Sequence, residues 1–271
     1  MTGLNIDGVA GWQGVSVLEP AGPPAPVVAC LPHGGRYFPA ELTEALAVRP
    51  EVLWSDWLTT ELYDFLPELG VTAITTTFSR FVADVNRDPA TGHGSFRSTV
   101  VAAQMPNGRA LYRRELTADE VGHRVGLAHA PFHQALDRVL ARLLAIFPRV
   151  LLLDLHSFGT EADGDVILGD RHGVTARPEV MGLLAGALAG GGLSVLRNTR
   201  YPGGWTVRRF AAQPRVDAVQ IELNQRRYLD LTRRRYPSQP PVGDFEGTQR
   251  LLRTVLADEV VGPLRARYAP R

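Results

Sequence analysis

The stretch LLLDLHSFG, residues 151–159, decides the fold of this chain. From Arg149 to Leu155 the sequence has the length and apolar character of a strand buried on both faces, which is typical of parallel sheets covered by helices. In open sheets of that kind, ligands bind beyond the carboxyl ends of the strands. Asp154 and His156 stand at such an end. A histidine there is either a site residue or a turn histidine with a local partner, and this stretch alone does not decide between them.

The composition is that of an ordinary globular protein with 271 residues, of which 45% are hydrophobic and 21% are charged. The formal net charge of +1 argues against nucleic acid or a membrane surface as a partner. All 29 basic residues are arginine, so arginine clusters carry less weight here as signs of a site. The single cysteine, Cys30, cannot form an internal disulfide. With no signal-peptide pattern and no apolar stretch of about 18 residues, we expect a cytoplasmic protein.

The remaining pattern alternates strands with helices. We expect strands at residues 27–32, 71–79, 80–86, 149–155, 165–170, 194–198 and 218–224, and helices at 38–48, 55–69, 117–147, 178–190 and 243–264. The alternation predicts a three-layer α/β/α sandwich with a central mixed, mainly parallel sheet, formed by a single domain over residues 1–271. Residues 1–25, rich in glycine and proline, read as an irregular lead-in, and residues 88–108 as a long loop. Pro131 is placed to break the third helix.

Polar residues follow several of these strands. His33 comes directly after the first strand, next to two glycines that allow a ligand or metal close to the backbone. RFVADVNRDP, residues 80–89, puts Asp84, Asn86 and Arg87 at another strand end. In VQIELN, Glu222 alternates with apolar residues inside a core strand, where a carboxylate is costly unless it is paired, metal-bound or used in chemistry.

Two histidines and several carboxylates at separate strand ends suit a catalytic zinc, which takes three protein ligands and keeps a fourth position for water. Zinc lowers the pKa of that water towards about 7, and a nearby glutamate can take its proton. Other interpretations stay open at this point. His33 can be a turn histidine, Asp154 can brace the loop of His156, and Glu222 can pair with Arg226 or Arg227.

Seven stretches spread from residue 32 to residue 230 match one family in their order along the chain. The stretches are PHGGRYFP, SDWLTTELYDF, SRFVADVNRDP, DLHSFG, DVILGDRHG, PGGWTVRRF and VQIELNQRRYLD. Together they resemble the N-formylglutamate amidohydrolase (deformylase) family, distantly related to the zinc carboxypeptidases. The resemblance implies a phosphorylase/hydrolase-like fold with helices on both sides of a mixed sheet.

The resemblance also implies a zinc site in which His33 and His156 are ligands. Asp154 is expected to support this site without binding the metal itself. Carboxypeptidases take their second ligand three residues after the first histidine, but that position is Arg36, which has no lone pair to offer. In the amidohydrolase family a carboxylate at the start of the next helix substitutes for it. That residue is Asp56, with Glu61 as the reserve choice.

For catalysis and substrate binding, the resemblance makes Glu222 the general base. DVNR resembles the asparagine–arginine pair that holds a substrate carboxylate, and the spacing in PGGWTVRR favours Arg208 over Arg209 as a second arginine for substrate. The residues expected to hold the substrate carboxylates are Arg80, Asn86, Arg87 and Arg208. Guanidinium groups suit this task because they bind carboxylates through two hydrogen bonds.

His129 and His133 are four residues apart and so share a helix face. HxxxH can bind metal, but the neighbouring glutamate of metalloproteases is missing here. Another possibility left open by the sequence is that His133 lines the pocket.

The sequence thus predicts a zinc-dependent amidohydrolase that cleaves the acyl amide of an N-acyl amino acid, with N-formyl-L-glutamate as the substrate implied by the family. The alternatives are a zinc carboxypeptidase-like hydrolase of another N-acyl amino acid or a short peptide, and a non-catalytic member of the fold. We expect a small-molecule substrate, no nucleic acid or membrane partner, and a monomer or small homo-oligomer. The acyl group, the metal and the oligomeric state are not fixed by the sequence.

Overall fold

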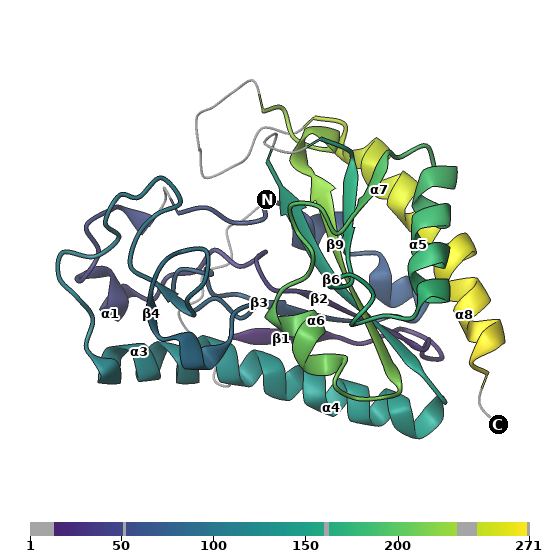
Figure 1. Ribbon diagram of the computed structural model, residues 1–271, viewed down its shortest axis with the longest axis horizontal. Helices are drawn as coiled ribbons and strands as arrows, with labels where there is room; N and C mark the ends of the chain where they lie inside the picture. Colours follow the sequence, from purple (N-terminus) through teal and green to yellow (C-terminus); the bar gives the residue numbers. More distant parts are fainter. Residues whose placement is uncertain (1–13, 51–52, 160–162, 232–242, 270–271) are drawn as a thin grey trace.

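The computed structural model describes residues 14–50, 53–159, 163–231 and 243–269, and its centre is a seven-stranded sheet (Figure 1). The strands in spatial order are β1 (Val15–Leu18), β3 (Thr72–Thr76), β2 (Val27–Leu31), β6 (Val150–Phe158), β9 (Val216–Asn224), β7 (Val166–Gly169) and β8 (Val195–Arg197). Neighbours are parallel except for the β1–β3 and β7–β9 pairs, which are antiparallel. The predicted mixed, mainly parallel sheet is confirmed.

Helices cover both faces of this sheet. The α-helices are α1 (Ala40–Thr43), α2 (Thr59–Leu62), α3 (Ala118–Arg124), α4 (Ala130–Ile146), α5 (Pro178–Gly190), α6 (Trp205–Phe210), α7 (Phe245–Thr254) and α8 (Gly262–Arg267). Shorter helical segments are η2 (Leu66–Leu69), η3 (Pro89–Thr91) and η5 (Gln225–Arg227), and π-helical turns are η4 (Val125–His129) and η6 (Val255–Val261). None of the helices in the described ranges is both long and apolar enough to cross a membrane.

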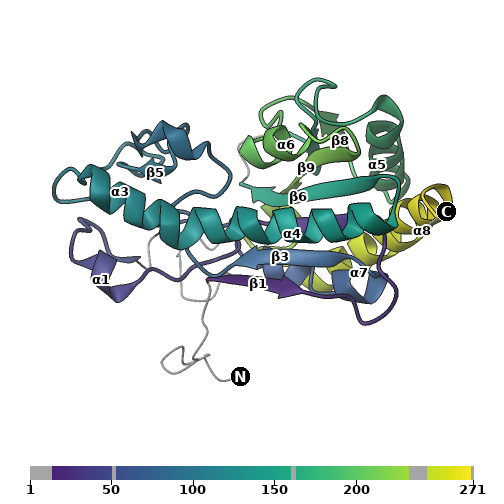
Figure 2. The ribbon, with the colours of Figure 1, turned by 90° about the horizontal axis from the view of Figure 1, so that it is seen from below.

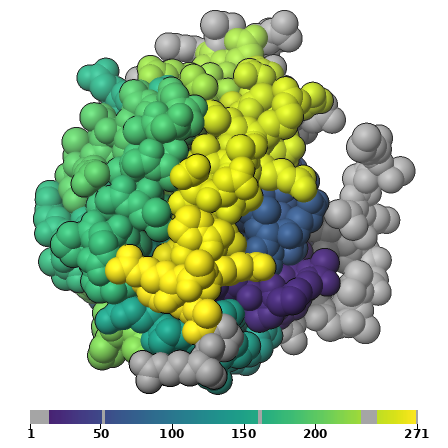
Figure 3. All heavy atoms as spheres, turned by 90° about the vertical axis from the view of Figure 1, so that its right-hand side faces the viewer, coloured from purple at the N-terminus to yellow at the C-terminus, as the bar shows by residue number. Residues whose placement is uncertain are grey.

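The two helical layers pack on alternate side chains of the same strands. Val28 and Leu152 belong to the core under α4 and α6, and Figure 2 shows α4 running along this face. Val27 and Leu153 belong to the core on the opposite face, under α2, α5, α7 and α8. Figure 3 shows the C-terminal helices crossing that side beside α5. Burial on both faces explains why β2 and the first four residues of β6 are apolar.

A side lobe lies beside the sheet at the left of Figure 1 and contains α1, α3 and the two-stranded sheet β4 (His93–Gly94) and β5 (Val101–Ala102). It has its own buried core, which includes Phe81, Val101 and Leu111. In Figure 2 the arrowhead of β6 points towards this lobe, so the carboxyl ends of the parallel strands face it. The long loop predicted at 88–108 contributes η3, β4 and β5 to the lobe.

Several sequence-based boundaries were wrong. The lead-in over residues 1–25 is not irregular throughout, because Val15–Leu18 forms β1 against β3; residues 1–13 lie outside the described part. The helix expected at 55–69 is reduced to α2 and η2. Leu58 adopts a left-handed φ of 57° immediately before α2, and Pro67, which has no backbone N–H to continue an α-helix, lies in the first turn of the separate segment η2. The helix expected at 38–48 is limited to α1.

The segment 80–86 is a loop and not the expected strand. The side chain of Asp84 explains this, because its Oδ1 accepts a hydrogen bond from the Asn86 backbone N–H at 2.9 Å. The Arg87 N–H donates to the Asp84 carbonyl at 3.1 Å. Local bonds of this kind offer the backbone an alternative to a sheet ladder.

The long helix expected at 117–147 continues past Pro131 without a break. The π-helical turn η4 joins α3 to α4 immediately before the proline. A widened turn is one way a helix absorbs a proline that removes a backbone donor.

Gly35, which follows β2, tests how closely the segment after β2 packs against the segment after β3. A Cβ at this position would lie 2.3 Å from the backbone oxygens of both Thr76 and Phe78. We expect Gly35→Ala to lower the free energy of unfolding by about 1–3 kcal/mol, because backbone atoms cannot yield as a flexible side chain can. Urea denaturation measures the change.

Gly122 in α3 is the matched control, since a Cβ there meets nothing within 4 Å. Gly122→Ala is expected to raise stability by up to about 1 kcal/mol, as alanine favours helix over glycine. A Gly35→Ala protein with an unchanged urea midpoint would contradict the close approach of these segments.

Candidate active site

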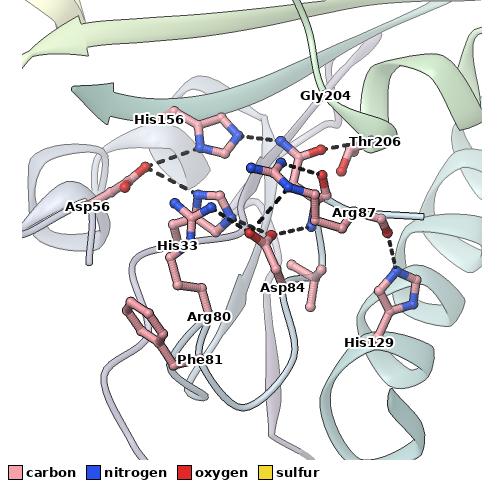
Figure 4. Close-up of polar contacts among 12 residues, drawn as sticks. His33, Asp56, Arg80, Phe81, Asp84, Arg87, His129, His156, Gly204 and Thr206 are labelled. Atoms are coloured by element: carbon pink, nitrogen blue, oxygen red, sulfur yellow. Dashed lines mark hydrogen bonds and ion pairs between the residues drawn. The ribbon is translucent and has the colours of Figure 1, made fainter. Parts of the chain in front are cut away.

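Three buried side chains meet beyond the carboxyl ends of β2 and β6 (Figure 4). His33 follows β2, Asp56 precedes α2, and His156 lies near the end of β6. One ligand atom from each lies within 4.8 Å of the others. In the ranges that the structure describes, this is the one group of histidine and acidic side chains with the spacing of a metal site.

The two imidazoles present the same nitrogen to Asp56. Asp56 Oδ2 lies 3.1 Å from His156 Nδ1 and 3.7 Å from His33 Nδ1. The segment carrying Asp56 is fixed by its own backbone, whose N–H donates to the His33 carbonyl at 3.0 Å. Asp56 Oδ2 also accepts the Ser157 backbone N–H at 3.1 Å. These contacts hold the carboxylate between the two rings.

The far nitrogen of each ring faces another carboxylate. His33 Nε2 lies 2.7 Å from Asp84 Oδ1, and His156 Nε2 lies 3.1 Å from Asp154 Oδ1. A carboxylate at Nε2 keeps the ring proton there and leaves the Nδ1 lone pair free for a cation. This arrangement is the one that metal-binding histidines commonly have.

Asn86 braces the second histidine through Asp154, the carboxylate that accepts the His156 Nε2–H. Its Nδ2 donates to Asp154 Oδ2 at 3.1 Å and lies 2.9 Å from His156 Nε2, while its Oδ1 accepts the Thr206 backbone N–H at 2.9 Å. Gly204 makes room for it, because a Cβ there would lie 2.4 Å from Asn86 Oδ1. Both ends of the Asn86 amide are thus occupied by partners within the protein. This favours a supporting role for Asn86 over the direct substrate contact predicted from the resemblance.

Arg80 and Arg87 converge on Asp84. Arg80 Nη2 lies 2.5 Å from Asp84 Oδ2, and Arg87 Nε lies 3.9 Å from the same oxygen. Burial raises the pKa of Asp84, but the charge of Arg80, together with His33 and Arg87, holds that pKa well below its usual range. The Nε of each arginine is buried without a hydrogen-bond partner. Two guanidinium groups therefore share one carboxylate and keep donors for a further anion.

Glu222 stands beside His156, since the two residues are paired in register on β9 and β6. Glu222 Oε1 accepts a hydrogen bond from Gln220 Nε2 at 2.8 Å, and Gln220 Oε1 accepts the Gly204 backbone N–H at 2.8 Å. Burial raises the pKa of Glu222 to about 7, against the opposing charge of His156. A carboxyl group with such a pKa can both accept and return a proton near neutral pH.

The charges of the cluster fit a divalent cation. The buried acids are Asp56, Asp84, Asp154 and Glu222, each at most 6% exposed. These four carboxylates face two guanidinium groups, those of Arg80 and Arg87, so the acids of the cluster outnumber its arginines by two. Buried charges are normally paired or bound to metal, so the donor atoms and the charge deficit both suit a dication.

The pKa shifts of His156 and Asp56 also suit a cation between them. Burial lowers the pKa of His156, but Asp154 and Asp56 outweigh burial and raise that pKa well above its usual value. Burial raises the pKa of Asp56, but hydrogen bonds with His156 and His33 bring it below its usual range. Because metal binding displaces protons from its ligands, a cation can take the place of the His156 proton.

Other predicted residues lie outside the cluster. Arg208 on α6 has a side chain that is 49% exposed, pairs with Asp88 at 2.9 Å and lies over the Trp205 ring. Glu61 is exposed on α2, so Asp56 and not the reserve choice joins the cluster. The open alternative that Arg226 or Arg227 pairs with Glu222 is not what the structure shows. Both arginines contact Asp165.

Asp84 and Gln220 are two site residues to which the sequence analysis gave no role. Asp84 stands two residues before Asn86, within the DVNR motif, and Gln220 stands two residues before Glu222 on the same strand face. That spacing is the one signal that connects each residue to the site, and it does not say which atom each would contact.

Comparison with known proteins identifies the family of this chain. The family model for N-formylglutamate amidohydrolase matches residues 25–229. N-formylglutamate deformylase of Pseudomonas aeruginosa is 31% identical over 219 residues, covering 76% of this chain and 82% of the relative. The corresponding deformylase of Pseudomonas putida is 29% identical over 221 residues, covering 76% and 83%.

Among solved structures, N-formylglutamate amidohydrolase from Ralstonia eutropha superposes with a TM-score of 0.82 at 25% identity. The superposition covers 94% of this chain and 100% of that structure. The matched region contains the residues of the cluster, from His33 to Glu222. This chain belongs to the N-formylglutamate amidohydrolase family.

Proposed function

We propose that this protein is a zinc-dependent hydrolase that converts N-formyl-L-glutamate to glutamate and formate. Family membership and the names of the two Pseudomonas relatives support the reaction. The observation that carries the proposal is the buried group of His33, Asp56 and His156 with Glu222 beside it. We also propose that the protein is cytoplasmic, because its single cysteine, Cys30, cannot form an internal disulfide.

The proposed zinc ligands are His33 Nδ1, His156 Nδ1 and a carboxylate oxygen of Asp56. Two nitrogens and one oxygen match catalytic zinc sites, which keep a further position for water or substrate. When bound, zinc would polarise the acyl carbonyl and lower the pKa of a water molecule. Asp84 and Asp154 hold the rings from behind and thereby fix the direction of both Nδ1 lone pairs.

Glu222 is the proposed general base. Its carboxylate takes a proton from the attacking water and later delivers it to the departing amino nitrogen, so that the amide bond breaks to give formate and a free amine. Gln220 holds Glu222 Oε1, which leaves Oε2 as the oxygen for proton transfer. Burial supports this role, because it sets the pKa of Glu222 at about 7.

The substrate carries two carboxylates, and the arginines are the proposed partners. Arg80 and Arg87 lie against Asp84, and the buried Nε of each makes no hydrogen bond, so the pair can offer donors to one carboxylate. Arg208, half-exposed on α6 and paired with Asp88, is the proposed partner for the other. Asn86 supports this site by holding Asp154, the carboxylate behind His156.

Glu222→Gln tests the base assignment. The amide keeps the shape of the side chain but cannot accept a proton, so we expect kcat to fall by about 10²–10⁴-fold. Zinc content, measured by metal analysis, should stay stoichiometric. Glu259→Gln, an exposed position on the C-terminal helix, is the control. Full turnover by the Glu222→Gln protein would rule out this role.

Asp84→Asn tests the support behind the first ligand. The amide removes the charge that holds His33 Nε2–H and leaves Arg80 without its partner. We expect zinc affinity, measured by chelator competition, to fall by about 10–100-fold. Asp137→Asn, which breaks a half-exposed ion pair with Arg209, is the control and should bind zinc normally. Equal affinity in the two variants would contradict the proposed support.

Arg87→Gln tests carboxylate recognition. Loss of a charge-assisted hydrogen bond should raise KM for N-formyl-glutamate by about 10–100-fold. Arg209→Gln serves as the control, because Arg209 pairs with Asp137 away from the cluster.

A substrate panel of N-formyl-glutamate, N-acetyl-glutamate, N-formyl-glutamine and a dipeptide completes this experiment. We expect preference for N-formyl-glutamate. A preference for the acetyl compound or the dipeptide would instead support a hydrolase of other N-acyl amino acids or peptides. No zinc and no turnover would support a non-catalytic member.

A further inference from the structure

One loop orients both candidate histidine ligands. Asp84 holds His33 Nε2, and two residues later Asn86 contacts His156 Nε2 and Asp154. A shift of this loop would therefore move both rings together. The segment is not part of a strand, so its position depends on contacts from outside the sheet.

Two histidines on one face of the α3–α4 helix hold this loop through its backbone. His133 Nε2 lies 2.8 Å from the Val85 carbonyl oxygen, and His129 Nε2 lies 2.9 Å from the Arg87 carbonyl oxygen. Figure 4 shows the His129 contact with the loop. The two carbonyls flank Asn86, so the histidines grip the backbone on both sides of it.

The chemistry of a carbonyl fixes the tautomer of each ring. A carbonyl oxygen only accepts hydrogen bonds, so each Nε2 must carry its hydrogen. The Nδ1 of His133 is buried and has no partner, which suits an unprotonated nitrogen. Burial lowers the pKa of His133 to about 3 and also lowers the pKa of His129, so both rings are neutral at pH 7.

Packing explains how the helix presents both rings. His129 ends the π-helical turn η4, and Pro131 follows it at the start of α4. The two rings lie 4.3 Å apart between centroids, and His133 stacks on Phe210 of α6 at 5.8 Å. Since α6 also donates the Thr206 N–H to Asn86, the helix, α6 and the loop form one contact region. π-Helical turns are frequent at functional sites.

We propose that His129 and His133 are positioning residues that clamp the loop of Asp84 and Asn86 and thereby preset His33 and His156 for their metal. Neither histidine belongs to the group that could hold a metal in the described part of the chain, which is made of His33, Asp56 and His156. The metal part of this inference rests on the proposed function.

The test compares His129→Ala/His133→Ala with His129→Gln/His133→Gln. Glutamine can place an amide N–H near the position of Nε2, so it keeps the donor, whereas alanine removes it. We expect the alanine pair to lower zinc affinity about tenfold and to change the visible absorption spectrum of the cobalt-substituted protein. The glutamine pair should retain most of the affinity and the spectrum. His123→Ala, exposed on α3, is the control.

Wild-type affinity and spectrum in the alanine pair would overturn the proposal. A folded glutamine pair that is as weak as the alanine pair would also overturn it, because ring packing and not the donor would then matter. ¹⁵N NMR of the wild-type imidazoles needs no variant and should show the neutral tautomer with hydrogen on Nε2. A hydrogen on Nδ1 of either ring would refute the clamp, even if the protein takes up no zinc and the proposed function fails.

Discussion

Asp56 Oδ2 between two imidazoles is the contact on which the rest of the site depends. The surrounding acids outnumber the nearby arginines by two, in a place with little access to water. Like charges at such a density are costly unless a cation joins them. The neighbouring hydrogen bonds can be understood as the means of holding these groups ready for that cation.

The sheet and the loops divide this work. The parallel register of β6 and β9 puts Asp154 beside Gln220 and His156 beside Glu222. These four polar residues are therefore neighbours in a sheet whose other central side chains are mainly apolar. The loop at 84–87 reaches His33 Nε2 through Asp84, and the segment before α2 reaches His33 Nδ1 through Asp56. Rigid strands set the spacing of the reactive groups, and helix-supported loops set their direction.

Much of this could be predicted from the sequence because it depends on local patterns. The leucines of β6 required a buried strand, and a histidine at its end was visible without coordinates. Asp56 was predicted as a ligand from the family resemblance alone, because nothing in the sequence distinguishes a metal-binding acid from any other acid just before a helix. The strand expected at 80–86 was wrong because a side-chain hydrogen bond of Asp84 outweighed β propensity.

The roles of Asp84 and Gln220 could not be predicted, because they depend on neighbours that the fold brings from distant parts of the chain. The same holds for His129 and His133, whose partners are backbone carbonyls more than 40 residues away. Sequence spacing located the HxxxH pair on one helix face but gave no means to distinguish a metal site from a clamp.

X-ray absorption at the zinc edge of the zinc-loaded protein tests the central claim most directly. We expect one zinc per chain, with two imidazole nitrogens at about 2.0–2.1 Å and the remaining ligands oxygen at about 2.0–2.2 Å. A zinc shell with fewer than two imidazoles, or a protein that binds no stoichiometric zinc, would contradict it.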